Sequence, residues 1–144
     1  MPISTGNLGV KRIRDHLIGF EAPDLCVIRM GEELTGEDGL ALYEEELRLA
    51  KEHGEIYVLS DFTRVRSITP EARKMSAELV ASPLIVGVAN FGVSFQVRVL
   101  AKLTMTLRRL AGNPVEGHLY LGSDEASARA WIDALRLERA QKRG

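Results

Sequence analysis

Short apolar runs without alternation recur along the second half of the chain. Ile56 to Leu59, Leu84 to Ala89 and His118 to Leu121 have this pattern, which is typical of strands covered on both faces and hence of a parallel sheet. Nearer the N-terminus, the segments 10 to 20 and 25 to 30 flank the turn-forming residues Ala22-Pro23-Asp24. They predict an antiparallel β-hairpin.

Four helices are expected, because four amphipathic segments each begin at a side chain that can cap a helix. They start after Thr35, at Thr69-Pro70-Glu71, after Ser94 and at Ser123-Asp124-Glu125. The first should span about 36 to 53, and the third should run to about Leu110. The predicted buried stripes are Leu40, Tyr43, Leu47 and Ala50; Ala72, Met75 and Leu79; Leu100, Leu103, Leu107 and Leu110; and Ala128, Trp131, Ile132 and Leu135.

The resulting order, ββαβαβαβα, predicts an α/β fold with a mostly parallel mixed sheet, an antiparallel N-terminal hairpin and about four helices. We expect a single domain over residues 1–144, with its core from about 10 to 135 and a short tail at each end. The third helix should stop at Gly112-Asn113-Pro114.

Composition excludes several classes of function. The 144 residues are 45% hydrophobic, and 19 Lys and Arg stand against 20 Asp and Glu, so no basic field favours nucleic acid. No apolar run approaches the roughly 20 residues that cross a bilayer, and the N-terminal stretch lacks the apolar core of a signal peptide. We therefore expect a cytoplasmic protein without a transmembrane segment. The single cysteine, Cys26, is expected to be a small buried hydrophobe.

The stretch LSDFTRVRSITPEARK joins a buried strand to a helix through hydroxyl and arginine side chains. Asp61 lies at the carboxyl end of the strand, where open α/β sheets place ligand sites. The polar residues that follow it are Thr63, Arg64, Arg66 and Ser67. One interpretation is a surface that binds a partner or ligand. The other is that Asp61 bonds the amides of its own loop while the arginines are solvated.

With this order of elements, the chain resembles the SpoIIAA-like or STAS-like family of small α/β domains, which is grouped with the lipid-binding SEC14 domains. The resemblance covers about residues 10 to 135. It is carried by MGEELTGEDG before the first helix, by YVLSDFTRV and ITPEARK, and by DEASARAWIDAL in the last helix. It implies a regulatory or interaction domain without catalytic activity.

Relatives that act as anti-sigma-factor antagonists carry Asp-x-Ser at a strand end, followed by an Asp-Ser-Ser-Gly-like helix start whose serine is phosphorylated. Asp61 and Thr63 resemble the first pair. The second element is missing, because the chain reads Ile68-Thr69-Pro70-Glu71 there. Thr69 is expected to act as a helix cap, so the sequence departs from the kinase switch of those relatives.

Other catalytic patterns are weak. Ser94 lies between a strand and a helix as in a nucleophile elbow, but Gln96 stands where the second glycine should be. His16, His53 and His118 have neither triad-like nor metal-ligand spacing. We expect no enzyme activity, no metal and no cofactor.

The third helix has an apolar band wider than one buried stripe. Val97, Ala101 and Met105 flank its leucines on one side, and Phe95 and Val99 flank them on the other. Its basic residues, Arg98, Lys102 and Arg109, lie opposite the leucines. Contact with a second subunit or an amphipathic ligand would explain this band, as would coverage by neighbouring elements. We add Val97, Arg98 and Met105 to the candidate binding residues.

Two functions therefore lead, and an enzyme whose site is assembled from distant residues stays open as a third. The first is a non-enzymatic regulatory domain that binds another protein or itself through the loop after Asp61 and the adjoining helix faces. The alternative, implied by the SEC14 side of the resemblance, is a small carrier or sensor of a hydrophobic ligand such as a lipid or acyl group. A carrier needs an apolar cavity of about 300 Å³ or more, whereas an interaction domain should be filled.

Overall fold

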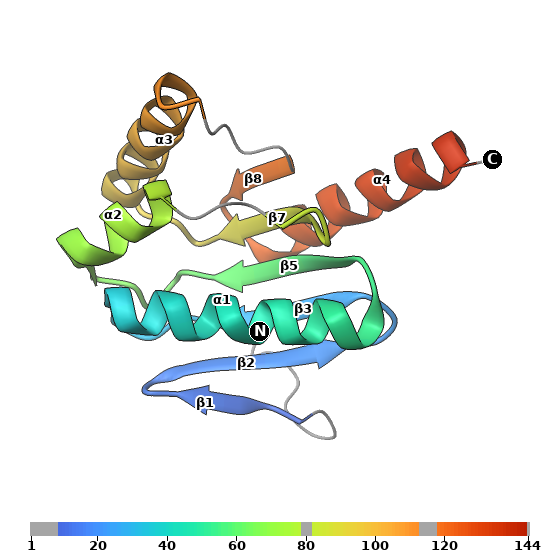
Figure 1. Ribbon diagram of the computed structural model, residues 1–144, viewed down its shortest axis with the longest axis horizontal. Helices are drawn as coiled ribbons and strands as arrows, with labels where there is room; N and C mark the ends of the chain where they lie inside the picture. The colour runs from blue at the N-terminus through green and yellow to red at the C-terminus, as the bar shows by residue number, and fades with distance from the viewer. Residues whose placement is uncertain (1–8, 79–81, 113–117, 144) are drawn as a thin grey trace.

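A six-stranded sheet forms the middle layer of the molecule (Figure 1). The computed structural model describes residues 9–78, 82–112 and 118–143. In spatial order the strands are β1 (Lys11–Ile13), β2 (His16–Glu21), β3 (Leu25–Arg29), β5 (Ile56–Asp61), β7 (Ile85–Phe91) and β8 (His118–Gly122). The first three pair antiparallel, and β3, β5, β7 and β8 pair parallel. The predicted fold class is confirmed.

Helices lie on both faces of this sheet. Three of them connect the parallel strands, and these are α1 (Gly36–His53), α2 (Pro70–Glu78) and α3 (Phe95–Leu110). Because the parallel strands follow chain order across the sheet, right-handed crossovers place these three helices on one face. The last helix, α4 (Glu125–Arg143), covers the other face. A two-stranded ladder of β4 (Glu33–Leu34) and β6 (Ser67–Ile68) ties together the loops that follow β3 and β5.

Each face of the sheet has its own apolar core. In β3, Leu25 and Val27 pack on the α4 side, whereas Cys26 and Ile28 pack on the α1 side, as the period of two in a strand requires. The predicted face of α4 is the face that packs, because Ala128, Ile132 and Leu135 are buried and Trp131 packs against them while partly buried. The sheet is thus covered on both sides, as its unalternating strands predicted.

The predicted helix starts are confirmed by their hydrogen bonds. The Thr35 hydroxyl accepts from the Asp38 amide in a full capping box. The Thr69 hydroxyl accepts from the Ala72 amide at 3.2 Å. The Ser94 hydroxyl accepts a hydrogen bond at 3.2 Å from the backbone amide of the third residue of α3. Each hydroxyl satisfies an amide that the helix itself leaves without a partner.

Two element boundaries differ from the predicted ones. The segment from 10 to 20 forms two strands, because a turn with Arg14 at φ 56° separates β1 from β2. The last helix continues to Arg143, beyond the predicted core. Its final turns are held by ion pairs from Arg139 and Arg143 to Glu55. Long-range pairs of this kind leave no periodic signal in the sequence.

The buried face of α1 also differs from the predicted stripe. Leu42 and Leu49 are buried, whereas Leu40 is 46% exposed. The same buried side contains Asp38 and Glu45, and these polar residues interrupt the apolar period that a sequence pattern relies on. Two further predictions, Leu79 in the second stripe and the helix stop at Asn113-Pro114, fall outside the described residues.

Candidate functional site

The loop after β5 is a tightly bonded turn. One oxygen of Asp61, Oδ1, accepts from the Thr63 amide at 2.8 Å and from the Thr63 hydroxyl at 2.7 Å. The Thr63 side chain lies against Gly92, where an added Cβ would come within 2.3 Å of its methyl carbon. Gly92 also has φ 69°, so only glycine suits this position sterically and conformationally. The carboxylate of Asp61 therefore serves the turn itself.

The rest of that loop is anchored through its backbone. The amides of Arg66 and Ser67 both donate to the Glu32 carbonyl, at 2.7 and 3.1 Å, and Ser67 pairs with Glu33 in the small ladder. The Arg66 side chain lies 3.8 Å from the Glu32 carboxylate but remains 82% exposed. Arg64 is exposed as well. The structure thus holds the loop in shape and leaves two arginine side chains at the surface.

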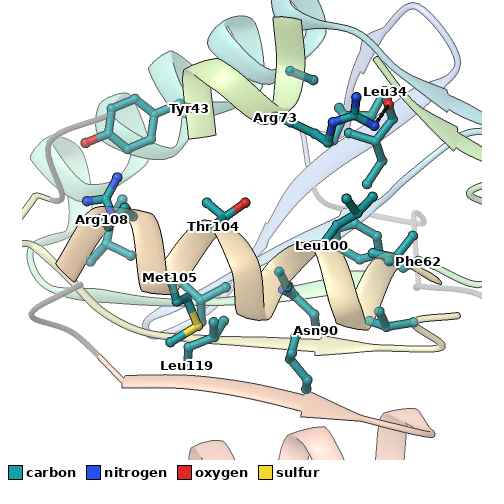
Figure 2. Close-up of a pocket in the computed structure, with 18 of the residues that line it drawn as sticks. Leu34, Tyr43, Phe62, Arg73, Asn90, Leu100, Thr104, Met105, Arg108 and Leu119 are labelled. Atoms are coloured by element: carbon teal, nitrogen blue, oxygen red, sulfur yellow. Dashed lines mark hydrogen bonds between the residues drawn. The ribbon is translucent and has the colours of Figure 1, made fainter. Parts of the chain in front are cut away.

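A cavity of about 350 Å³ lies beside this loop, between α3 and the sheet. Figure 2 shows its lining side chains, which come from α1, α2, α3, the sheet and the loop after β5. Most of the wall is apolar, and its contributors include Phe62, Val88, Val97, Leu100, Met105 and Leu119. The cavity exists because α3 packs mainly against α2. The helix therefore leaves a space between itself and the two strands that it connects, β7 and β8.

The orientation of α3 contradicts the predicted leucine stripe. Leu103 and Leu107 are about half exposed, at 53% and 50%, and Leu110 is 80% exposed. The inner face consists of Val97, Leu100, Ala101, Thr104, Met105 and Arg108. The helix is apolar around most of its circumference, so periodicity defined several candidate faces and could not select the one that turns inward.

The predicted site residues therefore separate into two groups. Val97 and Met105 line the cavity, whereas Arg98 is half-buried elsewhere on α3. The loop residues Asp61, Thr63, Arg64, Arg66 and Ser67 lie at the sheet edge next to the cavity, which Phe62 reaches from the same loop. Phe62 of the loop and α3 line the same cavity, whereas none of the predicted polar loop residues lines it.

Sequence reasoning missed the polar part of the cavity wall, and α1 and α3 supply four of its seven residues. Tyr43 and Glu46 come from α1, and Thr104 and Arg108 come from α3. Glu46 lines the cavity and keeps some exposed surface. Burial raises its pKa to about 8. The only sequence signal for this site was a glutamate within an amphipathic helix. On a surface helix such a glutamate normally lies on the solvated face.

A second polar cluster lies at the N-terminal end of α1, and its role is structural. His16 is fully buried, and its Nδ1 accepts from the Gly31 amide at 2.8 Å while its Nε2 lies 2.9 Å from Asp38 Oδ2. Nδ1 accepts, so Nε2 carries the proton and donates to Asp38. Arg14 also donates to this carboxylate. Both ring nitrogens of His16 are thus engaged, which leaves neither for a base.

The described residues contain no cluster of three His, Cys, Asp or Glu side chains that could hold a metal ion. Burial raises the pKa of the Cys26 thiol far above its usual range, which keeps it protonated and unreactive. Within the described part of the chain, no helix is both long and apolar enough to cross a membrane.

Comparisons with family models and with curated proteins found no match. Among solved structures, the chain is similar to an uncharacterized protein from the DUF3478 family of Shewanella loihica PV-4. That protein has a SpoIIAA-like fold. The alignment covers 90% of this chain and 98% of that chain, at 19% identity and with a TM-score of 0.45. A likeness this distant carries nothing over to this chain.

Proposed function

We propose that this protein is a non-enzymatic binding domain that takes up a small hydrophobic molecule between α3 and the sheet. The observation that carries the proposal is the cavity of about 350 Å³ with its mainly apolar wall. Its volume exceeds the lower limit of about 300 Å³ for small-molecule sites. A domain that works through its surface alone has no need of such a space, because protein interiors are otherwise close-packed.

The contacts of two candidate catalytic side chains support binding without catalysis. Ser94 accepts a hydrogen bond from the Val97 amide as a helix cap, and His16 is held between Gly31 and Asp38. A nucleophile needs a base within hydrogen-bond reach, and these contacts account for the serine and the histidine as structural groups. The binding function needs no further chemistry.

The outer face of α3 favours a second candidate function, binding of a protein partner or of a second copy of this chain. Five apolar side chains on it are between 48% and 80% exposed, namely Phe95, Val99, Leu103, Leu107 and Leu110. A contiguous exposed apolar patch is characteristic of an interaction site. One helix thus carries the cavity wall on its inner side and this patch on its outer side, an arrangement suited to a sensor that presents a surface to its partner.

Native mass spectrometry of the protein purified from its own cells tests the first proposal. A co-purified lipid or other apolar molecule is expected with wild type and should be lost in Ala101→Trp, which fills the cavity from α3. Ala130→Trp is the matched control, because Ala130 is exposed on α4. Equal ligand occupancy in the two variants would place the ligand somewhere else.

Sedimentation tests the second candidate separately. If the outer face of α3 mediates self-association, Leu103→Glu should abolish it, because an unpaired charge is costly at an interface core. Leu137→Glu is the control, since Leu137 is 61% exposed on α4. A wild type that remains monomeric at high micromolar concentration would remove self-association and leave a different protein as the partner.

A further inference from the structure

The outer face of α3 combines an apolar stripe with a basic edge. Viewed down the helix axis, its five exposed apolar side chains fall within an arc of about 120°. Arg98, Lys102 and Arg109 occupy the adjoining arc on one side of that stripe. The sequence of α3 contains no acidic residue, even in the first turn, where an acid would favour the helix dipole. The outer face is therefore amphipathic and carries positive charge alone.

The charges of this basic edge are not neutralised within the protein. In the part of the chain that the structure describes, no ion pair involves Arg98, Lys102 or Arg109. By contrast, Arg129 and Arg136 of α4 are each paired with acidic side chains. The whole chain has a formal net charge of -1, so the positive charge on α3 is local. It is available to an anionic surface that the protein does not supply itself.

The apolar stripe is exposed along the full length of the helix. Phe95 at the first position and Leu110 at the last are each 80% exposed. Figure 1 shows α3 at one edge of the molecule, where α2 is the helix that packs against it. A helix of 16 residues is about 24 Å long. An exposed stripe that runs from end to end suits contact with a flat surface.

We propose that the outer face of α3 docks the domain on an anionic lipid surface. Its apolar side chains would lie between the lipids, and the ends of Arg98, Lys102 and Arg109 would lie at the level of the phosphates. The inference goes beyond the proposed function, because it concerns the side of α3 that faces away from the cavity. It does not require the cavity to be filled.

The charge of α3 favours lipid over the other occupants of this face. A second copy of the chain would bring an identical helix without acids, so basic edges would meet across the two-fold axis. An acidic protein would match the charge, but it would also need an apolar groove as long as the helix. A bilayer with anionic lipids offers hydrocarbon and negative charge together along the whole stripe.

Co-sedimentation with lipid vesicles tests the proposal. Wild type should bind vesicles of equal parts phosphatidylcholine and phosphatidylserine, should bind phosphatidylcholine alone far less, and should be released by salt. Lys102→Gln combined with Arg109→Gln should lower the affinity by about fivefold for each charge removed. The matched control combines Lys51→Gln with Lys142→Gln, two exposed positions on α1 and α4. It removes the same charge and should bind as wild type does.

The apolar part of the contact has its own pair of variants. Phe95→Ser should weaken binding to the phosphatidylserine vesicles by about tenfold, because the ring would no longer be buried among the lipids. Leu137→Ser removes an apolar side chain that is exposed on α4 and should leave binding unchanged. All of these side chains are exposed, so each variant should keep the wild-type circular dichroism spectrum.

Uptake of a lipid into the cavity is distinguished by Ala101→Trp, which fills the cavity from α3. If the outer face docks, a folded Ala101→Trp variant should still bind the vesicles. Loss of vesicle binding in that variant would overturn the docking surface and leave the cavity as the lipid site. Equal binding to both kinds of vesicle would refute the role of the basic edge. Absence of binding to either kind would refute the proposal outright and leave the outer face to a protein partner.

Discussion

Replacing Glu46 with glutamine should make the ligand-free domain more stable in alkaline solution, because the substitution removes a carboxylate that folding buries. Burial raises the pKa of Glu46 from 4.5 to about 8. The folded state therefore holds the proton more tightly than the unfolded chain does. This group leaves stability unaffected below about pH 4.5, and stability then falls as pH rises to about 8, above which the loss is complete.

The magnitude follows from the size of the pKa difference. Each pKa unit corresponds to about 1.4 kcal/mol, so ionised Glu46 costs the folded protein up to about 5 kcal/mol at pH 9 and less than about 1 kcal/mol at pH 5. The cavity has room for water, which screens part of this cost. A gain for Glu46→Gln that grows by at least about 1.4 kcal/mol between these pH values would support the reasoning.

Urea unfolding at pH 5 and pH 9 measures the effect. The difference between Glu46→Gln and wild type cancels every other titrating group, provided that the two sites are independent. Glu44→Gln, on the exposed side of α1, should show a small difference that does not change with pH. Parallel pH profiles for wild type and Glu46→Gln would show that the carboxyl is hydrated in the folded protein, and the burial assigned to it would be wrong.

Three further predictions follow from the contacts described above. Thr69→Ala should lower the free energy of unfolding by about 1 kcal/mol, whereas Thr69→Asp should be nearly neutral because aspartate also caps helices; urea midpoints compare the two. Leu103→Glu should change stability by no more than about 0.5 kcal/mol, since Leu103 lies on the outer face of α3, and an unfolded far-UV circular dichroism spectrum would contradict that placement. Asp38→Ala should destabilise by about 3 kcal/mol because His16 and Arg14 lose their shared acceptor, and an unchanged melting temperature would show that the cluster contributes nothing.

The parts of this fold that were predictable from the sequence depend on local chemistry. Thr35, Thr69 and Ser94 each identified a helix start, because a cap needs only a hydroxyl and the amide three residues on. The mostly parallel sheet followed from the alternation of strands and helices with right-handed crossovers. The inward face of α4 was also predictable, since that helix has one apolar stripe with a polar remainder.

The candidate site was mostly hidden because it depends on how distant elements meet. Val97 and Met105 were found as flanks of a wide apolar band, but the inward side of α3 is set by its packing on α2. Glu46 and Arg108 were not singled out, because a charged side chain in a helical pattern is normally solvated. Side chains that line a cavity lie neither in bulk water nor in a close-packed core. The periodicity of a sequence does not distinguish this environment from the other two.

The separation of α3 from the sheet has a further consequence for the amount of folded protein in a cell. The cavity leaves part of the apolar interior on that side of the sheet unfilled, and the proposed ligand would complete it. A ligand that binds the folded chain alone raises its free energy of unfolding by mass action, by about 2.7 kcal/mol at a hundred times its dissociation constant. Proteases that remove the unfolded chain would then set the abundance of the domain according to the supply of its ligand, so that its cellular level would itself report that supply.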